Sequence, residues 1–179
     1  MPDTAARWHP TLLSSCALAT TAAEARYRVN APEFTRRSSR VIALDGESAR
    51  IVRELGGRSW GGGHFLVFES AVPDDALLRH SGTEGTGTEG TGSGGTALLS
   101  EELAGADTVV MIASAGANAE AASVIGDAAA ARGIMSAGLV LPGGDSVNEV
   151  VSALRPNAMV LVVLRDAADV PEVLSALRV

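Results

Sequence analysis

The stretch DTVVMIASAGANAEAASVIGDAAAARGIMSAGLVL, residues 107–141, decides the fold class. It contains two apolar runs of strand length, at residues 108–113 and 134–141. Between them, residues 119–132 favour a helix because they are rich in alanine, and Gly133 is a typical residue just past a helix end. The pattern predicts a βαβ unit with a tight turn at residues 114–118.

The same alternation of strand and helix continues on both sides of this unit. Parallel strands need crossover connections, and the predicted helices supply them. The sequence therefore predicts an α/β three-layer sandwich of about five mostly parallel strands. Further strands are predicted at residues 41–44, 64–68 and 158–164, and further helices at 49–55, 97–103, 146–154 and 169–177.

The chain divides into an N-terminal part and a single domain. Residues 1–39 read as an arm or helix, with alanine-rich residues 11–28 as its helical part, followed by a linker. Residues 40–179 form the predicted domain. Within it, residues 81–96 are a Gly/Thr-rich low-complexity segment with almost no apolar side chains, so we expect a mobile loop there.

Composition limits the function classes. The net charge is −7 and every basic residue is arginine, without a clustered basic face, so we do not expect nucleic-acid binding. No run approaches the 18 or so apolar residues of a membrane span, and the single cysteine, Cys16, excludes an intrachain disulfide. These features predict a cytoplasmic protein without membrane association.

The turns that follow three predicted strands carry the candidate ligand site. Carboxyl ends of parallel strands share one edge of a sheet, and ligands of such sheets bind there. Free backbone N–H groups at helix starts also favour anions. A simpler interpretation is that the polar side chains only cap helices and turns. The predicted ligand-binding residues are Asp45, Gly46, Ser48, Ser114, Gly116, Asn118, Gly143, Gly144 and Ser146.

We call this edge of the sheet, with the turns that follow the three strands, the rim. The charge at the rim restricts the kind of ligand. Five acidic residues fall there and would repel a phosphate unless Mg²⁺ intervened, so a cationic or neutral ligand is equally compatible. They are Asp45, Glu47, Glu120, Asp145 and Asp166.

The sequence shows no catalytic constellation. The histidines His9, His64 and His80 are far apart along the chain and have no second ligand at metal-binding spacing. No Gly-x-Ser-x-Gly nucleophile motif is present. We therefore predict no catalytic residue and no metal site, and the sequence assigns no cofactor.

Residues 103–116, LAGADTVVMIASAG, resemble the strand that enters the phosphate loop of the tubulin/FtsZ family. Residues 121–125 and 132–140 continue in register with that family's next helix and strand, and residues 41–55 match its first strand and helix weakly. The resemblance implies a Rossmann-like, GTPase-type fold.

The loop itself departs from the family pattern Gly-Gly-Gly-Thr-Gly-Ser/Thr-Gly. Residues 116–122 read GANAEAA, and their Cβ atoms and the Glu120 carboxylate fill the space where bare backbone would approach phosphate. GTP binding, hydrolysis and polymerisation are therefore not predicted from the resemblance.

Three functional hypotheses follow. The first is a non-catalytic Rossmann-like domain that binds a small ligand or a protein partner, with homodimerisation as the expected partner behaviour. The second is a Mg²⁺-dependent enzyme of nucleotide or phosphate chemistry. The third is a structural oligomerisation module, because alanine-rich helices allow close helix–helix contacts.

Overall fold

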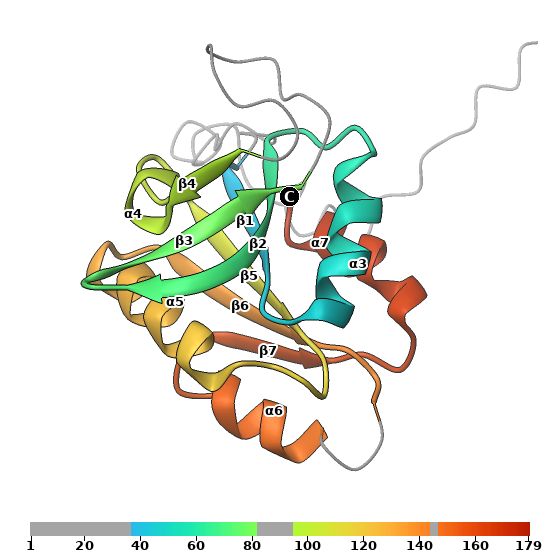
Figure 1. Cartoon of the computed structure of the whole chain (residues 1–179). Helices are drawn as coiled ribbons and strands as arrows, with labels where there is room; N and C mark the ends of the chain where they lie inside the picture. Colours follow the sequence, from blue (N-terminus) through green and yellow to red (C-terminus); the bar gives the residue numbers. More distant parts are fainter. Residues whose placement is uncertain (1–36, 82–94, 144–146) are drawn as a thin grey trace, which may run out of the picture. The chain divides into compact units, whose positions relative to one another are not determined.

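The computed structural model describes residues 37–81, 95–143 and 147–179, which belong to one unit, Arg36–Val179. They form an α/β domain around a seven-stranded mixed sheet (Figure 1). The predicted helix at residues 11–28 lies outside the described residues, as does most of the predicted loop at 81–96. The strands are β1 (Ser39–Ala43), β2 (Gly63–Val72), β3 (Asp75–His80), β4 (Thr96–Leu98), β5 (Thr108–Ala113), β6 (Met135–Val140) and β7 (Val160–Val163). The helices are α3 (Gly46–Gly56), α4 (Leu99–Glu102), α5 (Ala119–Ala131), α6 (Val147–Leu154) and α7 (Val170–Ala176), with a 3-10 turn η2 (Ala167–Asp169).

The strand order is β4-β3-β2-β1-β5-β6-β7. Strands β2, β1, β5, β6 and β7 run parallel to one another, and these are the five strands that the sequence predicts. β3 and β4 add to the β2 side in antiparallel orientation. The predicted count of about five strands is therefore too low, and the sheet is mixed.

The missed strand β3 follows a tight hairpin turn at Pro73-Asp74. Proline presets the backbone angle of the first turn residue, and Asp74 occupies the left-handed region with φ 62°, which Asp tolerates better than most residues. The β3 segment alternates between buried and more exposed side chains, with Ala76 and Leu78 buried. The Pro-Asp pair between two apolar runs is the signal from which this hairpin could have been predicted.

The predicted helix at residues 97–103 is partly wrong. Its first two residues belong to β4, where Leu98 pairs with Leu77 of β3, and α4 covers only Leu99–Glu102. These two residues pair with the outer edge of β3. The pairing satisfies their backbone N–H and C=O groups, which an additional helical turn would otherwise have to satisfy. Thr96, which the sequence places in the Gly/Thr loop, also belongs to β4.

Helices cover both faces of the sheet (Figure 1). α4, α5 and α6 pack on one face, and α3 and α7 pack on the other. The central strands β1 and β5 are buried along their whole length, which explains the apolar runs at residues 41–43 and 109–113. The first core centres on Ile42, Leu66, Met111, Ile125 and Leu154, and the second on Val41, Val52, Val110, Leu139 and Leu174.

Gly126 of α5 marks a close contact between α5 and the turn that leads into β7. A Cβ atom at Gly126 would lie 2.5 Å from Cβ of Asn157 and 3.0 Å from its Cα, so backbone would have to move. We expect Gly126→Ala to lower the free energy of unfolding by about 1–3 kcal/mol, although alanine has the better helix propensity. Gly46→Ala is the control, because a Cβ there meets nothing within 4 Å. Urea denaturation measures both, and equal midpoints for the two variants would contradict the contact.

The topology places a switch of strand order beside two of the predicted rim turns. From β1 the chain moves outward to β2 on one side, and then continues through β5, β6 and β7 on the other. The order therefore switches between β1 and β5, whose carboxyl ends carry two of the predicted rim turns. Among the described helices, none is long and apolar enough to cross a membrane.

Candidate functional site

Asp45 lies at the switch point, between the carboxyl ends of β1 and β5. Its side chain caps α3 by accepting hydrogen bonds from the backbone N–H groups of Glu47 and Ser48, at 3.0 and 2.9 Å. It also accepts from the Ser114 backbone N–H at 2.7 Å and from the Ser114 Oγ at 2.6 Å. One carboxylate thus joins the first turn of α3 to the end of β5.

The surroundings of Asp45 keep it ionised. Burial opposes ionisation, but the hydrogen bonds from Ser114 and Ser48 outweigh it, so the pKa of Asp45 lies below its ordinary value. A helix N-terminus favours one anion, and here the protein supplies that anion itself. A phosphate at the start of α3 would have to displace Asp45 or meet its charge.

The structure brings only some of the predicted rim residues together. Ser48 completes the capping box, because its Oγ accepts from the Asp45 backbone N–H at 3.1 Å. Asn118 instead caps its own helix, α5, through bonds to the N–H groups of Glu120 and Ala121. Both side chains therefore have the capping role that the simpler interpretation gives them.

The glycines of the rim leave its backbone bare. A Cβ at Gly46 would meet nothing within 4 Å, and one at Gly116 would meet only Cβ of Asp45, at 4.0 Å. Gly143 lies beside Ala115, with 3.5 Å between the position of a Cβ and the Ala115 Cβ. Gly144 and Ser146 lie outside the described residues, so the site predicted there stays a prediction.

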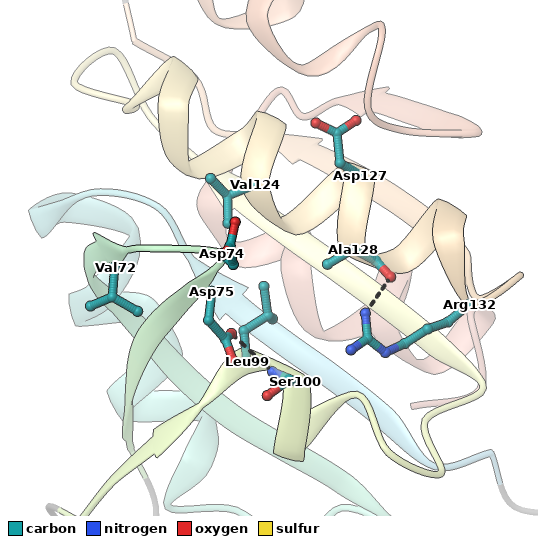
Figure 2. Close-up of a pocket in the computed structure, with 9 residues that line it drawn as sticks. All are labelled: Val72, Asp74, Asp75, Leu99, Ser100, Val124, Asp127, Ala128 and Arg132. Atoms are coloured by element: carbon teal, nitrogen blue, oxygen red, sulfur yellow. Dashed lines mark hydrogen bonds between the residues drawn. The ribbon is translucent and has the colours of Figure 1, made fainter.

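An open groove of about 430 Å³ lies among the described residues, away from the rim. Figure 2 shows it between the β2–β3 turn, the start of α4 and one side of α5. This volume falls within the range of small-molecule sites. Apolar lining comes from Val72, Leu99, Val124 and Ala128, and polar lining from Asp74, Asp75, Ser100, Asp127 and Arg132.

Charge in the groove is predominantly negative, with three carboxylates against one guanidinium. Asp75 accepts from the N–H groups of Ala76 and Ser100 at 2.8 and 3.1 Å, so it holds the start of α4 in place. Its pKa is lowered, because these hydrogen bonds outweigh the opposing effect of burial. Arg132 turns back along α5 and donates to the Ala128 carbonyl at 3.0 Å, as Figure 2 shows.

A second polar cluster lies at the opposite edge of the parallel strands, around the buried carboxylate of Glu102. Arg40 Nε lies 2.9 Å from Oε2 of Glu102 and 2.7 Å from its backbone oxygen. His64 Nδ1 lies 3.0 Å from Oε2, and His80 Nε2 lies 3.1 Å from Oε1. Burial opposes ionisation of Glu102, but the hydrogen bond from His64 and the charge of Arg40 outweigh it and lower its pKa.

Sequence reasoning missed this cluster and the groove. The spacing of His64 and His80 along the chain suggested separation, yet the β2–β3 hairpin places their ring centroids 6.4 Å apart. A sequence prediction that included the hairpin turn would have placed both histidines at the same end of the strands. Within the described ranges, no three His, Cys, Asp or Glu side chains are placed to hold a metal ion.

Comparison of the chain with protein-family models, curated proteins and solved structures finds no match. The resemblance to the tubulin/FtsZ family therefore stays a prediction.

Proposed function

We propose that the chain is a non-catalytic, Rossmann-like binding domain whose ligand is a small organic cation held in the groove of Figure 2. The observation that carries this proposal is the combination of an apolar lining with three carboxylates in a groove of about 430 Å³. Such a lining favours a molecule that has an ammonium or guanidinium group on a short hydrocarbon chain, because each part then has a complementary surface.

Two features favour an organic cation over a bare metal ion or a phosphate. The carboxylates of Asp74, Asp75 and Asp127 are not placed to share a metal ion, so they suit a cation that extends along the groove. The acidic lining and the net charge of −7 both disfavour an anionic ligand. The Mg²⁺-dependent phosphate enzyme is the weaker proposal, since the Asp45 carboxylate occupies the anion position at α3.

The finer fold assignment is part of the proposal. Helices on both faces and a strand order that switches between β1 and β5 support a three-layer, Rossmann-like sandwich with an antiparallel extension. The rim is a second candidate site, favoured by the bare backbone at Gly46 and Gly116. A neutral or cationic ligand suits it better than an anion, because the Asp45 carboxylate is at its centre.

The proposal is tested by isothermal titration calorimetry with agmatine and 1,4-diaminobutane. We expect both to bind, and Asp74→Asn combined with Asp127→Asn to weaken binding at least about tenfold, since two charge contacts are lost. Asparagine tolerates the left-handed backbone of Asp74, so the turn is retained.

The matched control removes two acidic charges elsewhere, by Glu149→Gln and Glu172→Gln on exposed faces of α6 and α7. The affinity of this control should stay within about twofold of the wild type, because neither residue lines the groove and salt screens exposed charges at physiological ionic strength. Equal weakening by the two double variants would mean that net charge alone attracts the amines. Absence of binding heat for both amines would contradict the proposal.

A further inference from the structure

Arg132 is the one basic side chain among the described residues that line the groove of Figure 2. Its Nη1 donates to the Ala128 carbonyl at 3.0 Å, which holds the guanidinium against α5. A guanidinium has five N–H donors, and no other hydrogen bond and no ion pair of this group is found within the described ranges. The Nε and Nη2 donors of Arg132 are therefore available to a ligand.

The three carboxylates of the groove are not equivalent. Asp75 already accepts hydrogen bonds from two backbone N–H groups. Burial raises the pKa of Asp75, but these hydrogen bonds and, more weakly, the charge of Arg132 lower it overall, so Asp75 and Arg132 attract each other. Asp74 and Asp127 form no ion pair in the described part of the chain, and the hydrogen bond found for them runs from Ser123 Oγ to Asp127, at 3.3 Å. Two carboxylates and one guanidinium are thus left for a ligand.

We propose that the ligand of this groove is a free basic α-amino acid, such as arginine, whose carboxylate pairs with Arg132. This assignment rests on the proposed function, because the cationic groups of the ligand still bind to Asp74 and Asp127. Free arginine carries two cationic groups and one carboxylate, which complement the charges available in the groove. A carboxylate and a guanidinium form two parallel hydrogen bonds, so this pair adds geometric specificity as well as attraction.

Related ligands match the groove less completely. A diamine or agmatine binds to both aspartates but offers Arg132 only a further positive charge, which is unfavourable. A peptide that ends in arginine has the carboxylate and the guanidinium but lacks an ammonium group on the same carbon, so one aspartate stays without a charged partner. The apolar side chains of Leu99, Val124 and Ala128 contact the methylene groups in each case.

The helix end beside Arg132 does not exclude a carboxylate. α5 ends at Ala131, and the C-terminus of a helix carries a partial negative charge of about half an elementary charge. Arg132 bonds to one of the last carbonyls of α5 and carries a full positive charge, which exceeds this partial charge. The end of α5 therefore attracts the carboxylate only through Arg132, so the preference for an amino acid depends on this one side chain.

Isothermal titration calorimetry of the full chain with arginine and agmatine tests the proposal, because agmatine is arginine without the carboxylate. We expect the wild type to bind arginine at least about tenfold more tightly than agmatine. Arg132→Gln should weaken arginine binding about tenfold or more, and should leave agmatine binding at least as tight as in the wild type, since it removes a positive charge. Retained agmatine binding also shows that the variant is folded. Arg53→Gln is the matched control, because it removes an exposed arginine of α3 that does not line the groove, and it should keep the preference for arginine.

The binding pattern distinguishes failure of this assignment from failure of the proposed function. If neither arginine nor agmatine binds, both are contradicted. Agmatine binding without a preference for arginine, or a preference that survives Arg132→Gln, overturns the amino-acid assignment alone. The tripeptide Gly-Gly-Arg separates a free amino acid from a peptide end: we expect it to bind at least about tenfold more weakly than arginine, because one charge contact is lost. Equal or tighter binding of the tripeptide would overturn the assignment to a free amino acid.

Discussion

Replacing Glu102 by glutamine is expected to lower the free energy of unfolding by about 3–5 kcal/mol, because it removes one partner of a buried ion pair. The side chains of Arg40 and Glu102 are only 6% and 10% exposed. Glutamine keeps the shape of the site but takes from the buried Arg40 guanidinium the carboxylate that contacts it. It also deprives His64 and His80 of the carboxylate that both contact. Urea denaturation at neutral pH measures the loss.

The acid dependence of stability provides a second readout for Glu102. Its pKa is lowered in the folded state, so its contribution is present above the pKa of the unfolded chain and is lost as the pH falls through the folded pKa. The Glu102→Gln variant should therefore lose less stability than the wild type over this acidic range. The control is Glu54→Gln, which breaks an exposed pair with Arg58 and should cost about 0–1 kcal/mol. Similar losses for both variants would contradict the role of burial.

Asp45→Ala is expected to destabilise the domain by about 2–4 kcal/mol. The substitution removes the N-cap of α3, which typically contributes about 0.5–2 kcal/mol. It also leaves the buried Ser114 without the acceptor of its N–H and Oγ donors, at a further cost of about 1–3 kcal/mol. Asn118→Ala is the matched control, because Asn118 caps α5 without bridging two elements, so only the smaller capping loss is expected.

The dependence of stability on acidic pH also tests the contribution of the ionised Asp45 carboxylate. The folded pKa is lowered, so the wild type loses the stabilisation by this carboxylate as the pH falls below the ordinary aspartate range, while Asp45→Ala has none to lose. The stability difference between the two proteins should therefore shrink toward low pH. A constant difference down to about pH 2 would show that ionisation of Asp45 is not responsible, since the carboxylate of an unfolded chain is protonated there.

The parallel half of the sheet is predictable from sequence because its strands are buried on both faces. Continuous apolar runs such as residues 108–113 have no competing explanation when alanine-rich helical segments flank them. β3 was not predictable in the same way, because Arg79 and His80 interrupt its apolar pattern, and its identity depends on pairing with β2. β4 depends in turn on β3, so one missed turn at Pro73-Asp74 hid two strands.

The candidate sites also differ in how far the sequence predicts them. Asp45, Ser48 and Ser114 follow predicted strands, and the structure joins them by hydrogen bonds. That these side chains satisfy one another's hydrogen bonds could not be predicted from the sequence, because it depends on β1 and β5 being neighbours. The groove and the Glu102 cluster both include residues of the β2–β3 hairpin, so neither site could be predicted from the sequence without this hairpin.

The most direct test of the central claim, an organic cation in the groove, is a series of ¹H–¹⁵N correlation spectra recorded while agmatine is added to the full chain. We predict shifts confined to residues 72–75, 99–100 and 124–132, with residues 114–118 of the rim unmoved. Shifts at the rim without shifts in the groove, or unchanged spectra at millimolar agmatine, would contradict the proposed function.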